Sequence, residues 1–149
     1  MSELPSGAPA EILLVEDSEG DIRLTREALR DSKIVNNLHV VMDGVEAMDF
    51  LYGRGEYSGA KRPDLIILDL NLPRKDGREV LEEIKSNDDL KLIPVAVLTT
   101  SKDDEDVIQS YSSHANCYIR KPLDMEGFFK VVTMIENFWF QIVKLPPNR

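Results

Sequence analysis

The chain of 149 residues has a formal net charge of -9, and 42% of its residues are hydrophobic. This length suits one domain with a substantial core, and the negative charge argues against binding to nucleic acid through its phosphates. No apolar stretch is long enough to span a bilayer, residues 1–10 lack the pattern of a signal peptide, and the single cysteine excludes an internal disulfide. We therefore expect one cytoplasmic domain over residues 11–149, with a flexible arm before it and no output domain.

Short apolar runs alternate with amphipathic segments along the chain, which predicts alternating strands and helices. In chain order we expect a strand over 12–15, a helix from Ser18 to Leu29, a strand over 38–41, a helix over 45–51, a strand over 65–68, a helix around 80–84, a strand over 95–98, a helix over 103–113, a strand over 118–119 and a long helix from 124. Because parallel strands need crossover connections, five such alternations predict a parallel sheet with helices on both faces.

Polar residues follow the ends of four of these predicted strands. They are Glu16 and Asp17, Asp69, Thr99 and Lys121. Since the carboxyl ends of parallel strands meet at one edge of a sheet, three carboxylates would repel one another there unless a cation or a proton relieved them. Mg²⁺ prefers such oxygen ligands, and a carboxylate can attack phosphorus, so the pattern predicts a magnesium site with Asp69 as nucleophile. Lys121 would neutralise charge on the transferred group, and Thr99 would donate a hydrogen bond to it.

Each of these residues alone also has an ordinary structural explanation. An acidic pair after a strand is often a solvated turn, and a threonine suits a strand by propensity alone. A lysine before a proline is often a turn as well. The conjunction of suitable chemical types at four strand ends favours a functional site over these explanations.

Four segments resemble the receiver domains of bacterial two-component response regulators, the family that includes chemotaxis CheY. They are ILLVEDSEGD, PDLIILDLNLPRKDG, IPVAVLTTS and CYIRKPLD. The resemblance implies a flavodoxin-like, doubly wound α/β fold with a five-stranded parallel sheet in the order 2-1-3-4-5. It further implies that Asp69 accepts a phosphoryl group from a sensor histidine kinase. The protein would then be a switch and not an enzyme, although it would assist its own phosphoryl transfer and dephosphorylation.

The same resemblance assigns the metal ligands. Mg²⁺, or Mn²⁺ in its place, would be held by Asp17 directly, by Glu16 through water, by Asp69 and by the backbone carbonyl of Asn71. The cation would be the only cofactor, because no phosphate-binding loop of the GxxxxGK type is present.

Further residues match the positions that carry the phosphorylation signal in this family. Thr99 and Lys121 match the switch threonine and the lysine of the site, and Tyr118 matches the aromatic switch position. Asn71 and Ser101 lie where such domains tune dephosphorylation. Phosphorylation would alter the surface made by the fourth helix, the fifth strand and the fifth helix.

Two features are similar to the small response regulators that partner cyanobacterial and other bacterial phytochromes. The loop over residues 52–63 is longer than in a minimal chemotaxis receiver, and the chain ends in the aromatic segment FWFQIVKLPPN. Phe138, Trp139, Phe140 and Ile142 surround too much of the final helix to face one core. We therefore expect these four residues to form a homodimer interface. The similarity to the small response regulators further implies that the kinase is a phytochrome.

Two other functions fit parts of the pattern. A phosphohydrolase of haloacid dehalogenase type also uses an aspartyl nucleophile, but it needs a second aspartate where this chain has Asn71. A phosphorylation-independent adaptor would be expected to have lost Asp69 or Lys121, and both are present. His39 and His114 have no carboxylate or cysteine at ligand spacing in the sequence, so no metal site is expected at either.

Overall fold

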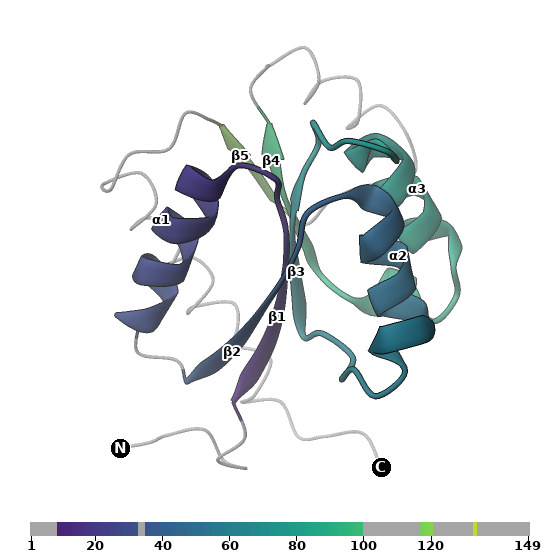
Figure 1. The fold of residues 1–149 in the computed structure, drawn as a ribbon, viewed down its shortest axis with the longest axis horizontal. Coiled ribbons are helices and arrows are strands. Elements are labelled where there is room, and N and C mark those ends of the chain that lie inside the picture. The colour runs from purple at the N-terminus through teal and green to yellow at the C-terminus, as the bar shows by residue number, and fades with distance from the viewer. Residues whose placement is uncertain (1–8, 33–34, 100–116, 121–132, 134–149) are drawn as a thin grey trace.

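The computed structural model describes residues 9–32, 35–99, 117–120 and 133. Within them, one parallel sheet has the order β2-β1-β3-β4-β5. The strands are β1 (Ala10–Val15), β2 (Asn36–Val41), β3 (Leu65–Asp69), β4 (Val95–Thr99) and β5 (Cys117–Arg120). The helices are α1 (Glu19–Arg30), α2 (Gly44–Tyr52) and α3 (Gly77–Ser86), with 3-10 turns η1 (Gly55–Tyr57) and η2 (Leu90–Leu92). Helix α1 covers one face of the sheet, and α2 and α3 cover the other (Figure 1). The predicted doubly wound α/β fold is confirmed.

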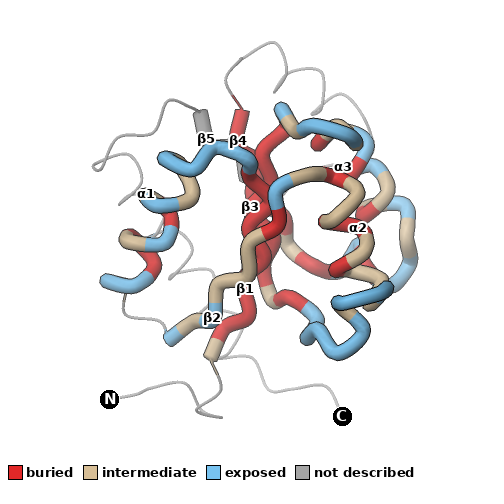
Figure 2. Tube along the Cα trace, in the orientation of Figure 1, coloured by how far each residue is buried: buried red, intermediate tan, exposed pale blue. Residues whose placement is uncertain are grey.

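The central strands are buried on both faces, as their continuous apolar sequences predict. Every residue of β1, β3 and β4 is buried, whereas most of the edge strand β2 is only partly buried (Figure 2). Alternate residues of β1, β3 and β4 enter two hydrophobic clusters, one on each face. In β1, for example, Leu13 packs on the side of α2 and α3, and Leu14 packs on the side of α1.

Side chains fix where the helices begin and end. Ser18 accepts a hydrogen bond at the start of α1, as predicted, and Asp43 does the same for α2. Helix α3 begins with a capping box between Asp76 and Glu79. Helix α2 ends at Gly53, whose φ of 67° is the left-handed conformation in which glycine is favoured. These caps bring the helix starts to the same edge as the strand ends.

The predicted elements within the described residues are all present, with ends moved by a few residues at most. Asp69 and Thr99 become the last residues of their strands rather than the first residues beyond them. The predicted helix over 103–113 and the four predicted dimer residues, Phe138, Trp139, Phe140 and Ile142, lie outside the described residues. Among the described residues, no helix has both the length and the apolar character needed to cross a membrane.

Candidate metal centre

Three carboxylates meet at the carboxyl edge of the sheet. Glu16 and Asp17 follow β1 directly, and Asp69 is the last residue of β3. The strands align Val15 with Leu68, so the next residues of the two strands reach the edge together. One carboxylate oxygen from each of the three acids lies within 4.8 Å of the other two. The structure therefore brings together the three acids that the strand ends predicted.

The surroundings of the three acids differ. Glu16 is fully buried and Asp69 is 3% exposed, whereas Asp17 is exposed. The backbone N–H of Ser18 donates to Glu16 Oε2 at 3.1 Å, and the N–H of Asn71 donates to Asp69 Oδ1 at 3.1 Å. These bonds orient two carboxylates that are close to a third of the same charge. A cation bound between the three acids would offset the repulsion between their like charges.

The donor set fits a hard divalent cation. Mg²⁺ binds oxygen at about 2.1 Å, so its opposite ligands lie about 4.2 Å apart. The oxygens of Glu16, Asp17 and Asp69 already lie within 4.8 Å of one another. Small side-chain rotations would therefore bring them into one coordination shell, and the exposed position of Asp17 leaves that shell open to water and to an incoming group.

Gly77 allows helix α3 to begin beside Asp69. Its N–H donates to the Leu70 carbonyl at 3.0 Å. A Cβ at this position would lie 2.5 Å from Leu70 Cα and closer still to the Asp69 carbonyl oxygen. Sequence reasoning missed this packing role of Gly77. Only contact with a residue seven positions earlier reveals it.

Thr99 reaches the same edge from β4. It is fully buried, and the register pairs Asp69 with Leu98 and Thr99 with Arg120. The N–H of Leu70 donates to the Leu98 carbonyl at 3.1 Å, which continues the ladder one step beyond Asp69. Thr99 is therefore one position past the partner of Asp69, at the same edge of the sheet as the three acids. Lys121, Ser101 and the side chain of Tyr118 lie outside what the structure describes.

A second polar cluster lies at the opposite, amino end of the sheet. His39 Nε2 is 2.7 Å from Glu11 Oε1, and Asn37 Nδ2 donates to Glu11 Oε2 at 3.0 Å. Burial alone would raise the pKa of Glu11, but the hydrogen bonds from His39 and Asn37, with the positive charges of His39 and Lys61, outweigh it and lower that pKa. Sequence reasoning did not find this carboxylate partner of His39, because spacing along the chain does not show partners on neighbouring strands.

Comparison with known proteins identifies the family. A family model for the response regulator receiver domain matches residues 12–133. The chain belongs to the response regulator receiver family. Phosphorylation of an aspartate is typical of this family, and a receiver domain implies a histidine kinase as partner.

Two curated relatives match this response regulator over most of their length. The response regulator Rcp1 of Synechocystis sp. is 55% identical over 141 residues, which cover 95% of this chain and 96% of Rcp1. The probable methanogenesis regulatory protein FilR2 of Methanothrix harundinacea is 40% identical over 131 residues, 88% of this chain and 84% of FilR2.

Two solved structures have the same architecture as this response regulator. The phosphorylated cyanobacterial phytochrome response regulator RcpA matches with a TM-score of 0.82 and 52% identity, over 94% of this chain and 100% of the RcpA chain. The Mn²⁺-bound form of Rcp1 matches with a TM-score of 0.80 and 55% identity, over 93% of this chain and 100% of the other. Receiver domains bind Mg²⁺ or Mn²⁺ at an acidic pocket, and this chain has such a cluster at Glu16, Asp17 and Asp69.

Proposed function

We propose that this response regulator accepts a phosphoryl group on Asp69 and that Glu16, Asp17 and Asp69 hold the Mg²⁺ the transfer requires. The observation that carries the proposal is the meeting of these three carboxylates within 4.8 Å at the end of β3. The backbone carbonyl of Asn71 is the fourth proposed ligand. Bound there, Mg²⁺ or Mn²⁺ would neutralise charge on the phosphoryl oxygens and on the attacking carboxylate.

Asp69 is the proposed nucleophile. One carboxylate oxygen attacks the phosphorus of a phosphohistidine, a P–O bond forms, and the P–N bond breaks as the imidazole leaves and takes up a proton. The Asn71 N–H, which donates to Asp69 Oδ1 at 3.1 Å, restricts the rotation of the carboxylate. Burial of Asp69 to 3% exposure keeps most water away from the resulting acyl phosphate.

Other residues at the edge complete the switch. The Thr99 hydroxyl would donate to one phosphoryl oxygen, and Lys121, the residue after β5, would pair with another. Movement of Thr99 toward the phosphoryl group would let the Tyr118 ring turn inward. Asn71 and Ser101 would set how quickly water removes the phosphoryl group, which is the extent to which the chain assists its own dephosphorylation.

The partners follow from the family and its relatives. The kinase we propose is a phytochrome, because RcpA is a cyanobacterial phytochrome response regulator and matches 94% of this chain. The phosphoryl transfer would take place in the cytoplasm, where ATP supplies the kinase. The output we propose is a homodimer that uses the fourth helix, fifth strand and fifth helix together with Phe138, Trp139, Phe140 and Ile142. Residues 11–149 would act as one receiver unit in that dimer.

Intact mass after incubation with acetyl phosphate and Mg²⁺ tests the proposal. We expect one phosphate adduct on the native chain, none on Asp69→Asn, and none when EDTA removes the cation. Asp64→Asn is a matched control, because Asp64 precedes the same strand at the opposite end, where it accepts a hydrogen bond from the Glu11 N–H. It should be phosphorylated like the native chain. An adduct that persists on Asp69→Asn would refute the assignment, and no adduct on any folded protein, even with candidate kinases, would favour the adaptor.

A further inference from the structure

The loop between β3 and α3, residues 70–76, carries the proposed Asn71 ligand, so its position bears directly on the metal centre. The Asn71 N–H donates to Asp69 Oδ1, which ties the start of the loop to the acceptor. Farther along, Arg74 has a φ of 66°, a left-handed conformation that a residue with a side chain rarely adopts. Such a conformation persists only where the surrounding structure holds it.

The start of α2 is the first of two elements that hold this loop. Arg74 Nη1 is 3.1 Å from Asp43 Oδ2, and the other oxygen of Asp43 accepts the hydrogen bond that caps α2. The backbone of Lys75 passes so close to Gly44 that a Cβ there would lie 2.7 Å from the Lys75 carbonyl carbon. The loop is therefore packed against the beginning of α2 and joined to it by an ion pair.

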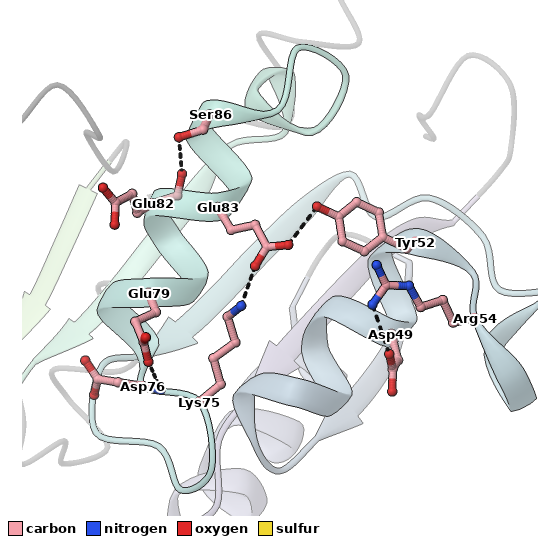
Figure 3. Close-up of polar contacts among 9 residues, drawn as sticks. All are labelled: Asp49, Tyr52, Arg54, Lys75, Asp76, Glu79, Glu82, Glu83 and Ser86. Atoms are coloured by element: carbon pink, nitrogen blue, oxygen red, sulfur yellow. Dashed lines mark hydrogen bonds and ion pairs between the residues drawn. The ribbon is translucent and has the colours of Figure 1, made fainter.

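Glu83 on α3 makes the second attachment. Lys75 Nζ donates to Glu83 Oε1 at 2.5 Å, and the Tyr52 hydroxyl donates to Glu83 Oε2 at 2.8 Å. Figure 3 shows Lys75 and Tyr52 converging on this one carboxylate from the loop and from the end of α2. The bond from Lys75 lowers the pKa of Glu83 despite burial, and the same bond raises the pKa of Lys75. The pair therefore stays ionised across the neutral range.

Tyr52 is itself held from the segment that follows α2. The Arg54 guanidinium lies over the Tyr52 ring, 4.5 Å from its centroid, and Arg54 Nη1 is 3.5 Å from Asp49 Oδ1. Gly53, in the left-handed conformation, turns the chain so that Arg54 can return over the ring. These contacts come from the start of the 52–63 loop, which the sequence marked as longer than in a minimal receiver.

We propose that Glu83 is a positioning residue for the metal centre. By binding Lys75 and Tyr52 together, it holds the β3–α3 loop, and with it the Asn71 carbonyl, where the divalent cation needs a ligand. The inference rests on the proposed metal centre and adds Tyr52 and Lys75 to the groups on which cation affinity depends. The side chains of Lys75 and Glu83 are 30% and 32% exposed, so solvent only partly screens their attraction.

The competing explanation is an ion pair that only stabilises the fold. Such a pair would contribute slightly to stability and leave cation affinity unchanged. Cation affinity therefore separates the two explanations, and it is measurable without phosphoryl transfer.

Titration calorimetry with Mn²⁺ alone, on the full chain, tests the proposal. We expect Glu83→Gln to bind Mn²⁺ about threefold to tenfold more weakly than the native chain, which is at or below the lower end of the roughly 10- to 100-fold effect typical of outer partners of metal ligands. Glu82→Gln is the matched control, because it removes the same charge from the adjacent position of the same helix. Among the described residues the Glu82 side chain has no hydrogen bond or ion pair, and Figure 3 shows it pointing away from Glu83. It should bind Mn²⁺ like the native chain.

A milder variant and a double variant guard against misfolding. Tyr52→Phe removes one hydroxyl and should weaken Mn²⁺ binding in the same direction by about twofold, which is less than the loss of the ion pair. The double variant Lys75→Met/Glu83→Gln should have an Mn²⁺ affinity no lower than that of the single variant that binds Mn²⁺ less tightly. The two substitutions remove the same bond between Lys75 and Glu83, so their effects should not add. Raising the Mg²⁺ concentration should restore the maximal phosphorylation rate of Glu83→Gln, since only cation affinity has changed.

The results also separate this inference from the proposed function. If the native chain binds Mn²⁺ and is phosphorylated on Asp69, but Glu83→Gln and Tyr52→Phe both bind Mn²⁺ as tightly as Glu82→Gln, only the positioning role of Glu83 is refuted. If the native chain binds no Mn²⁺, the metal centre itself is refuted, and the positioning role with it.

Discussion

Strand β1 has a buried glutamate at each end, and the two differ in what surrounds them. Glu11, 7% exposed, lies at the amino end and is contacted by hydrogen-bond donors, His39 and Asn37, both from the neighbouring strand β2. Glu16, fully buried, lies at the carboxyl end within 4.8 Å of the carboxylates of Asp17 and Asp69. The same residue type thus lies beside two side-chain donors at one end and beside two further carboxylates at the other.

The difference teaches that burial of a carboxylate does not by itself indicate function. At Glu11 the fold supplies the compensation internally, because the donors lower its pKa in spite of burial. At Glu16 the neighbouring acids make the electrostatics less favourable, and a bound cation would relieve this repulsion. We therefore expect the amino end to contribute to stability and the carboxyl end to provide the proposed cation site.

The largest effect that tests this contrast is on cation binding. Glu16→Gln removes one of the three like charges while leaving an oxygen that can accept from the Ser18 N–H. We expect Mn²⁺ affinity to fall by about tenfold or more, in line with the loss of a metal-site carboxylate or its outer partner. Calorimetry measures this directly.

The free energy of unfolding at saturating Mn²⁺ provides a control for the loss of Mn²⁺ affinity in Glu16→Gln. A ligand present at a hundred times its Kd stabilises a folded protein by about 2.7 kcal/mol. The native chain should show this gain when Mn²⁺ replaces EDTA in a urea titration, and Glu16→Gln should show less of it at the same Mn²⁺ concentration. Equal gains in the two proteins would mean that Glu16 does not contribute to the cation site.

A Glu-to-Gln substitution at the other end of β1 should lower the free energy of unfolding and leave Mn²⁺ affinity unchanged. Glu11→Gln should lower the free energy of unfolding by about 1 kcal/mol, because a neutral amide replaces two charge-assisted hydrogen bonds. The loss stays small because the Gln oxygen can accept from Asn37 while its amide donates to His39 in the other tautomer. Mn²⁺ affinity should match that of the native chain. A loss of Mn²⁺ affinity in Glu11→Gln would remove the distinction between the two ends of the strand.

The fold and the site edge followed from local features of the sequence. Continuous apolar runs identified the central strands, because strands buried on both faces have no polar alternation to obscure them. The acids after those runs then had to meet, since parallel strands share their carboxyl edge. Glu16, Asp17, Asp69 and Thr99 could therefore be placed at one edge of the sheet from the amino-acid sequence alone.

Contacts between distant segments could not be predicted in the same way. Glu11 precedes an apolar run and resembles a strand end in solvent, and only the parallel register with β2 brings His39 beside it. The hydrogen bonds of Lys75 and Tyr52 to Glu83 likewise depend on how α2 and α3 pack on the same face of the sheet. No periodicity along the chain encodes that packing.

The smallest expected effect is a difference in the pH dependence of stability. The folded-state pKa of Glu11 lies below its ordinary value of 4.5, so the ionised form stabilises the fold above that pH. As the pH falls through the lowered value, the folded protein also takes up the proton and this contribution is lost. The difference in unfolding free energy between the native chain and Glu11→Gln should therefore hold from neutral pH to about pH 4.5 and shrink below it, by roughly 1 kcal/mol or less. Urea titrations in EDTA at a series of pH values measure this difference in unfolding free energy. The contributions of the three acids at the carboxyl edge cancel in the difference, because both proteins contain them. A difference that is already lost between pH 7 and pH 6 would mean that the charge of Glu11 is not what stabilises the amino end.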